Sequence, residues 1–158
     1  MRLIITSILA LAAFHSIPAN PSAVVQIKLS DVCGKGPDDF PPPPGVPHCE
    51  DDHHIDYDCF TACRTTYKDN MVNISAQACD QLTQAIDEAE QDIDDAQLAF
   101  NLCEDEIEDC LDAYFAEVFR IFLHFRETRR NISTQYNIAR AVAVEAYGAC
   151  IDTCCEPD

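Results

Sequence analysis

Residues 79–114 decide the fold, and they read CDQLTQAIDEAEQDIDDAQLAFNLCEDEIEDCLDAY. Apolar residues recur through this stretch in alternating steps of three and four, which is the spacing of the contact face of a coiled-coil helix. These positions are Cys79, Leu82, Ile86, Ala89, Ile93, Ala96, Phe100, Cys103, Ile107, Cys110 and Tyr114. Five uninterrupted heptads predict a long helix that packs against a partner helix.

The sequence on either side also favours long helices. From residue 48 to residue 147 there is no glycine and no proline, the two residues that most disfavour a helix interior. A second apolar series with helical spacing runs from Ile132 to Cys154. We therefore predict an all-α fold over residues 55–158. It would be a disulfide-stapled antiparallel helical hairpin or coiled coil with two or three long helices.

Two asparagine-rich stretches are the predicted turns between these helices. Residues 69–75 and 129–133 each combine Asn with Ser, residues that favour helix N-caps and loops. A first, shorter helix would then begin near Asp56. The alternative is one unbroken helix over residues 56–128, because apolar residues continue in steps of four across the first stretch.

The ten cysteines predict a set of disulfides, since an even number is typical of exported, cross-linked proteins. In an antiparallel helix pair the numbers of facing residues add to a constant, because both helices rise by about 1.5 Å per residue. The predicted pairs are Cys110–Cys150 and Cys103–Cys154 around a turn near residue 130, Cys63–Cys79 around a turn near Met71, and Cys33–Cys49 in the N-terminal segment. Cys59 and Cys155 are left to pair with Cys33, with Cys49 or with another chain.

Four of the cysteines form two C-x3-C pairs, Cys59/Cys63 and Cys150/Cys154. In this respect the chain is similar to the twin C-x3-C helical hairpins. Those proteins carry their two pairs much closer together and lack an apolar leader. The resemblance is therefore confined to the spacing within each pair, and no property of that family is transferred to this chain.

The N-terminus has the order of a secretory signal peptide. Arg2 precedes an almost wholly apolar run over residues 3–14, and the small residues Ala19 and Ala23 follow. The run is shorter than the roughly 20 residues that cross a bilayer. We expect removal of residues 1–19 or 1–23, and a secreted protein, or a periplasmic one if the source is bacterial. Residues 24–54 contain repeated prolines and predict an extended, irregular segment.

The charge distribution excludes some partners and suggests others. The formal net charge is −18, and fourteen acidic residues lie between residues 80 and 117, where there is no Lys or Arg. A basic face for nucleic acid or anionic lipid is therefore absent from this region. The acidic residues are interpreted either as a solvated helix face or as a surface for a basic partner.

A cluster of arginines follows the acidic residues along the chain. It consists of Arg120, Arg126, Arg129 and Arg130. With a turn near residue 130, these cations would lie at a helix C-terminus, where the helix dipole stabilises them. Opposite charges in two parts of one molecule also suggest self-association as a hypothesis.

One short stretch and two sequons are candidate binding or modification sites. Asp52, His53, His54 and Asp56 carry side chains that bind zinc or copper. The alternative for these four residues is a polar loop that leads into a helix N-terminus. Asn73 and Asn131 each begin an N-I-S sequon, which is a glycosylation site if the source is a eukaryote.

Catalytic motifs are missing from the sequence. It contains no G-x-S-x-G, no H-E-x-x-H and no Gly-rich phosphate loop. We therefore predict a non-enzymatic structural or protein-interaction module that presents an acidic helical surface and needs no cofactor. The alternative is a protein that binds a metal ion or small ligand, at the His53/His54 loop or in an apolar pocket near residues 114–125.

Overall fold

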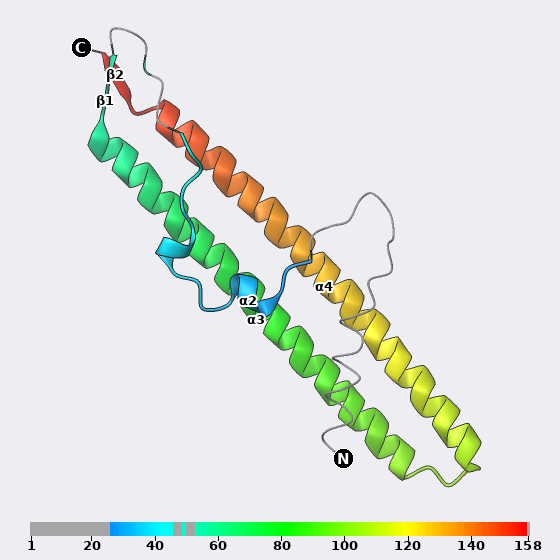
Figure 1. Cartoon of the computed structure of the whole chain (residues 1–158). Coiled ribbons are helices and arrows are strands. Elements are labelled where there is room, and N and C mark those ends of the chain that lie inside the picture. The colour runs from blue at the N-terminus through cyan, green and yellow to red at the C-terminus, as the bar shows by residue number, and fades with distance from the viewer. Residues whose placement is uncertain (1–25, 46–48, 50–52, 158) are drawn as a thin grey trace.

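The computed structural model describes residues 26–45, 49 and 53–157. Two helices make up most of it, α3 (Tyr57–Asn101, 45 residues) and α4 (Ile107–Asp152, 46 residues). They lie side by side in opposite directions, and residues 102–106 connect them (Figure 1). The predicted fold class, an all-α antiparallel helical hairpin held by disulfides, is confirmed. The predicted signal peptide and parts of the predicted Pro-rich segment lie outside the described residues.

Shorter elements flank the hairpin. They are α2 (Leu29–Val32), the 3-10 helix η1 (Pro37–Asp39), β1 (His53–Ile55) and β2 (Cys155–Pro157). The two strands form an antiparallel pair in which His54 is opposite Glu156, and the pair lies at the open end of the hairpin (Figure 1). A backbone hydrogen bond of 2.8 Å from Asp56 N to Cys154 O continues the connection between them. The end of α4 is thereby held beside the start of α3.

The start of α3 has a clear local cause. The Asp56 carboxylate accepts hydrogen bonds from the backbone N–H groups of Asp58 (2.9 Å) and Cys59 (3.2 Å). An aspartate in this position satisfies N–H groups that have no partner within the helix. The absence of glycine and proline up to residue 147 then allows both helices to continue without a break other than the turn.

One register relates the two helices from the open end to the turn. Five contacts cross between them, or close the turn itself. They are the disulfides Cys59–Cys154, Cys63–Cys150 and Cys103–Cys110 and the ring pairs Tyr67–Tyr147 and Phe100–Tyr114. In every pair the two residue numbers add to 213 or 214. A constant total is expected for two antiparallel helices with the same rise per residue, so the hairpin does not slip along its length.

The core is a narrow seam between α3 and α4. The part near the open end is centred on Met71, which is fully buried among Tyr67, Ala143 and Tyr147. The middle part consists of Ala78, Leu82, Ala85, Ile132 and Tyr136, and two residues of the N-terminal segment, Ile27 and Val32, complete it. Each helix therefore buries one stripe of side chains and leaves the rest of its surface to solvent.

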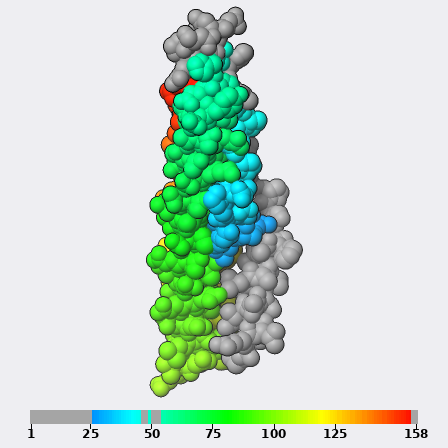
Figure 2. Space-filling view, turned by 90° about the vertical axis from the view of Figure 1, so that its left-hand side faces the viewer, coloured from blue at the N-terminus to red at the C-terminus, as the bar shows by residue number. Residues whose placement is uncertain are grey.

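The N-terminal segment forms a strap across this seam. Residues 26–45 lie along the flank of α3 in the space-filling view (Figure 2). The Ile27 backbone N–H donates to the buried Ser133 hydroxyl at 3.2 Å, and the Ile27 carbonyl accepts from the Arg129 guanidinium at 3.2 and 3.3 Å. A disulfide between Cys33 and Cys79 fixes the strap to α3. The strap therefore extends the shallow seam into a third layer.

The predicted turns are wrong, because α3 continues through residues 69–75 and α4 through residues 129–133. Ser133 is buried in the seam, and Asn and Ser express only a weak local preference that packing overrides. The alternative of one helix over residues 56–128 is also wrong. In a continuous helix Cys103 and Cys110 would lie about 10.5 Å apart, whereas their disulfide holds the two Cα atoms 6.0 Å apart across the turn.

Two leucines of α3 give a matched test of the seam. Leu82 is 2% exposed, whereas Leu98 is 57% exposed on the same helix. We expect Leu82→Ala to lower the free energy of unfolding by about 2–5 kcal/mol, since it removes buried methyl groups and leaves a cavity. Leu98→Ala should change it by less than about 0.5 kcal/mol. Urea unfolding with the disulfides intact measures both, and equal losses would contradict this seam.

Candidate functional sites at the two ends of the hairpin

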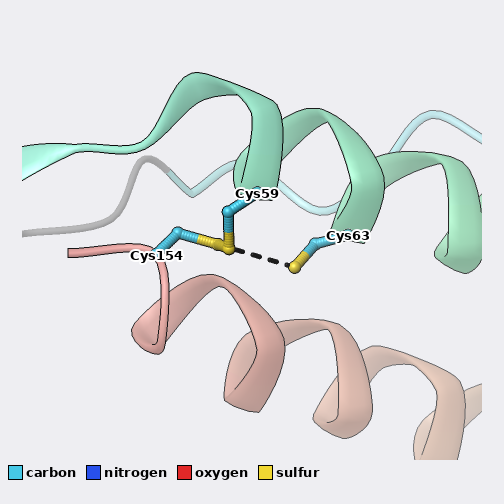
Figure 3. A group of neighbouring side chains, drawn as sticks. All are labelled: Cys59, Cys63 and Cys154. Atoms are coloured by element: carbon cyan, nitrogen blue, oxygen red, sulfur yellow. Dashed lines mark hydrogen bonds between the residues drawn. A yellow bond between two sulfur atoms is a disulfide. The ribbon is translucent and has the colours of Figure 1, made fainter. Parts of the chain in front are cut away.

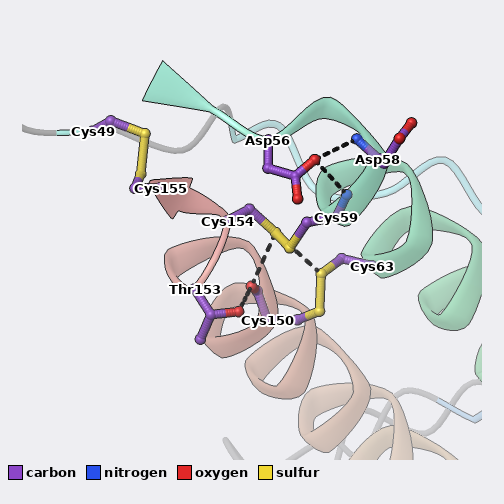
Figure 4. Close-up of a disulfide and its surroundings, with 9 residues drawn as sticks. All are labelled: Cys49, Asp56, Asp58, Cys59, Cys63, Cys150, Thr153, Cys154 and Cys155. Carbon is purple, nitrogen blue, oxygen red and sulfur yellow. Dashed lines mark hydrogen bonds between the residues drawn. A yellow bond between two sulfur atoms is a disulfide. The ribbon is translucent and has the colours of Figure 1, made fainter. Parts of the chain in front are cut away.

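The open end of the hairpin carries three disulfides close together, which we call the base cluster. They are Cys59–Cys154, Cys63–Cys150 and Cys49–Cys155, with Cα–Cα distances of 5.5, 5.8 and 5.4 Å. Figure 4 shows the first two as consecutive bridges from the first turns of α3 to the end of α4. The third joins the N-terminal segment to β2. Three segments that are distant in sequence are thereby linked at one point.

Three sulfur atoms in the base cluster are mutual neighbours. The Sγ atoms of Cys59, Cys63 and Cys154 all lie within 4.8 Å of one another, and Cys63 Sγ is 3.7 Å from Cys154 Sγ (Figure 3). Cys63 and Cys154 are buried. All ten cysteines of the chain are disulfide-bonded. The oxidised protein therefore offers neither a thiolate nucleophile nor a thiolate ligand.

The disulfide pairs predicted from the sequence are wrong. Cys110 pairs with Cys103, Cys150 with Cys63, Cys154 with Cys59, Cys79 with Cys33, and Cys49 with Cys155. The rule of a constant total is correct, but it was applied around turns that do not exist. Around the observed turn, the two C-x3-C pairs are the ones that face each other, so their matching spacing was the signal for this site.

The predicted metal-binding loop is not assembled as a site among the described residues. Asp56 uses its carboxylate to cap α3. His53 and His54 belong to strand β1, and His54 is exposed. Asp52 lies outside the described residues. Asp56 therefore leads into a helix N-terminus, as the alternative predicted, but His53 and His54 lie in a strand and not in the polar loop of that alternative.

The closed end of the hairpin is the second candidate site. We call residues 98–119 the hairpin tip; they comprise the end of α3, the turn and the start of α4. The tip contains seven acidic residues and no Lys or Arg. It also exposes five large apolar side chains, Leu98, Leu102, Ile107, Phe115 and Phe119. The helical periodicity did not reveal these exposed residues, because it placed residues 79–114 on one continuous helix.

The acidic residues are arranged differently from the prediction. They are exposed, apart from the partly buried Glu117. They lie on two helices and the turn between them, so the predicted single acidic helix face is wrong. The four arginines lie in the middle of α4 and not at its C-terminus. The helix dipole therefore does not explain their position.

Glu117 and Arg120 form an ion pair on the surface of α4. The Arg120 guanidinium donates to the two carboxylate oxygens at 2.9 and 2.5 Å. These hydrogen bonds hold the pKa of Glu117 below its ordinary value and raise the pKa of Arg120. Asp92 of α3 also contributes an attraction that raises the Arg120 pKa. Arg120 thus interacts with acidic residues of both helices.

The two sequons lie on helices. Asn73 and Asn131 are exposed on α3 and α4, whereas the third residue of each sequon, Ser75 or Ser133, is buried in the seam. The predicted location of both sequons at turns is wrong. An exposed Asn side chain nevertheless leaves space for a glycan on the outside of the hairpin.

A pocket for a small ligand is not found where the sequence suggested one. Near residues 114–125 the seam encloses a cavity of about 10 Å³ between Ala85 and Ala89 of α3 and Ile121 and Phe125 of α4. Pockets that bind drug-sized ligands usually measure about 300–1,000 Å³. Phe125 of this region packs against the middle part of the seam, whereas Phe115 and Phe119 are exposed, so these aromatic side chains do not enclose a ligand site.

Comparisons with known proteins add no assignment. No family model, no curated protein and no solved structure matches the chain. Among the helices of the described residues, none combines the length and the apolar character needed to cross a membrane. Any functional conclusion therefore depends on the two ends of the hairpin themselves.

The ion pair on α4 gives a pH-dependent prediction. Because the pKa of Glu117 is lower in the folded protein, the pair stabilises the fold above the ordinary glutamate pKa. This contribution is lost as the pH falls through the lowered pKa. In an NMR titration, Arg120→Gln should raise the titration midpoint of Glu117, whereas Arg140→Gln, farther along α4, should not. An unchanged midpoint in Arg120→Gln would contradict the pairing.

Proposed function

We propose that this chain is an exported, non-enzymatic interaction module whose hairpin tip binds a basic, amphipathic protein segment. The observation that carries the proposal is the composition of the tip. Exposed apolar side chains project from a region whose charged residues are all acidic. A partner with both lysines or arginines and an apolar face would complement both properties.

The apolar residues of the tip are placed as pairs on helix faces. Phe115 and Phe119 are 60% and 61% exposed and lie one helical turn apart, so they share one face of α4. Leu98 and Leu102 have the same relation at the end of α3. Large aromatic side chains are frequent energetic anchors of protein interfaces. The two phenylalanines are therefore the first candidates for direct contact with a partner.

The charge of the tip favours encounter with a basic partner. Its seven acidic residues lie within a short, solvent-exposed region, and Glu117 has a basic partner of its own in Arg120. Such a concentration of one sign accelerates association with the opposite sign and weakens with added salt. Acidity also disfavours nucleic acid and anionic membranes as alternatives.

Rigidity supports a role in binding. The Cys103–Cys110 disulfide closes the turn, and the rings of Phe100 and Tyr114 lie 5.5 Å apart just behind it. A tip that is ordered before binding loses less conformational entropy when a partner docks. Export is supported by the leader-like N-terminus and by five disulfides, which form and persist in oxidising compartments.

The tip can be tested with a synthetic helical peptide that has leucines on one face and lysines on the other. We expect fluorescence anisotropy to show binding that weakens as the salt concentration rises. The double change Phe115→Ser/Phe119→Ser should weaken binding about tenfold or more, which corresponds to about 1.4 kcal/mol. Val142→Ser/Val144→Ser is the matched control, since these valines are exposed on α4 outside the tip.

Two results would overturn this assignment. One is equal affinity of the Phe115→Ser/Phe119→Ser protein and the wild type. The other is equal affinity for a peptide with the same charge but serines in place of the leucines. Either result would mean that any attraction is purely electrostatic and that the exposed apolar side chains are not an interface.

Export has a separate test. When the full chain is expressed in cells that secrete it, we expect the protein in the medium to begin at Asn20 or Val24. N-terminal sequencing and the intact mass measure the cleavage point and count the disulfides. Retention of residues 1–19 on protein that stays inside the cell would contradict export without affecting the interpretation of the tip.

A further inference from the structure

The base cluster places four cysteines of two helices around one point. Cys59 and Cys63 are one turn apart on α3, and they face Cys150 in the last turn of α4 and Cys154, which lies two residues after the end of α4 (Figure 4). In the oxidised protein these four residues form two disulfides. We propose that, when both disulfides are reduced, the four thiolates bind one zinc ion. The oxidation state of the base cluster would then decide whether zinc is bound.

The spacing of the backbone fits a four-cysteine site. Across the helices the Cα–Cα distances are 5.5 Å for Cys59–Cys154 and 5.8 Å for Cys63–Cys150. Along α3, Cys59 and Cys63 are separated by about 6 Å, since they lie four residues apart on one helix. Three of the distances between neighbouring Cα atoms in the cluster are therefore similar. The familiar C-x2-C spacing serves zinc ligands in loops, whereas residues four apart place two sulfurs on one face of a helix.

The spacing of the sulfur atoms fits as well. A tetrahedral zinc ion with Zn–S bonds of about 2.3 Å holds its sulfur ligands about 3.8 Å apart. Cys63 Sγ and Cys154 Sγ, which belong to different disulfides, are already 3.7 Å apart. Cys59 Sγ lies within 4.8 Å of both. Breaking the two S–S bonds would let each bonded pair separate toward the same distance while the backbones stay in place.

The surroundings suit a structural site with four protein ligands. Cys63 and Cys154 are buried, and Tyr67, Tyr147 and Ile151 pack in the same core cluster. A closed, four-thiolate environment of this kind is typical of structural zinc. The neighbouring Cys155 is bonded to Cys49 and directed to the N-terminal segment. The four residues of the C-x3-C pairs therefore form the ligand set, and Cys49 and Cys155 remain outside it.

Two phosphine molecules and two waters reduce the two disulfides to four thiols, and each phosphine becomes a phosphine oxide. Zinc binding then releases the four thiol protons as the thiolates coordinate the metal. Oxidised glutathione reverses the process: two molecules of it re-form the two S–S bonds, are reduced to four molecules of glutathione, and zinc is released. No sulfur is a zinc ligand and a disulfide partner at the same time.

The test uses the full chain, reduced with a phosphine without oxygen or metal, and then given one equivalent of Zn²⁺. A maleimide labels free thiols, and mass spectrometry locates the label. We expect Cys59, Cys63, Cys150 and Cys154 to be protected and the other six cysteines to be labelled. With a chelator in place of zinc, labelling of these four residues should become faster, whereas the rate at the other six cysteines should not change; comparing rates separates zinc protection from the burial of Cys63 and Cys154. The oxidised protein should bind no zinc in equilibrium dialysis.

Variants distinguish this site from adventitious binding to thiols. Cys63→Ser should expose the remaining three cysteines of the site to the maleimide, whereas the matched change Cys103→Ser/Cys110→Ser should leave protection intact. If reduction unfolds the hairpin, circular dichroism should show that zinc restores helix, since metal binding and folding are coupled. Labelling that zinc does not alter, or protection that moves to Cys33, Cys79 or Cys155, would overturn the proposal.

Discussion

The register between α3 and α4 is the constraint on which the rest of the structure depends. A two-helix hairpin buries only one stripe from each helix, and this stripe mixes small alanines with larger side chains such as Leu82, Ile132 and Tyr147. A shift of one helical turn would break contacts such as the ring pair Tyr67–Tyr147. The disulfides Cys59–Cys154 and Cys63–Cys150 exclude that shift, because Cα atoms in a disulfide are limited to about 4.4–6.8 Å.

The three disulfides of the base cluster do not stabilise the fold independently. The first to form closes a loop of roughly 90 residues, and closing a loop of this size reduces the entropy of the unfolded chain by the equivalent of about 4–5 kcal/mol. Once Cys63–Cys150 has formed, Cys59–Cys154 encloses only a few additional residues beyond each end of that loop. The later disulfides therefore reduce the entropy of the unfolded chain by a smaller amount. Their main effect is to fix the geometry at the open end of the hairpin.

The fold class could be predicted from the sequence, but the position of the turn could not. A hundred residues without glycine or proline and a sustained apolar repeat have few solutions other than long helices. The same repeat continues through Phe100, Cys103, Ile107 and Cys110, where the chain in fact reverses. The turn, residues 102–106, contains three acidic residues and no Gly or Pro, so local preferences give no sign of a turn there.

The location of both candidate sites depends on where the chain reverses. The sequence did not reveal that position, so it did not reveal the sites. The rule that facing residue numbers add to a constant can be used only when the centre of the turn is known. A turn centred near residue 130 predicts the wrong cysteine pairs. The equal spacing of the two C-x3-C pairs was the better guide, because only equal spacings allow two disulfides between rigid antiparallel helices. Of the exposed apolar residues of the tip, Ile107 belonged to the predicted contact stripe and the others did not, because a stripe shows periodicity but not what covers it.

The same register explains why the acidic residues of the tip have few basic residues near them. Because the numbers of two facing residues add to about 214, the stretch of α4 from Arg120 to Arg130 lies beside residues 84–94 of α3. These residues of α3 are rich in Asp and Glu. The attraction between Arg120 and Asp92 is one instance of this pairing of opposite charges. Beyond Arg120 no Lys or Arg remains in the tip to balance its acidic residues. The Cys103–Cys110 disulfide holds the ends of the two helices together against the mutual repulsion of these acidic side chains.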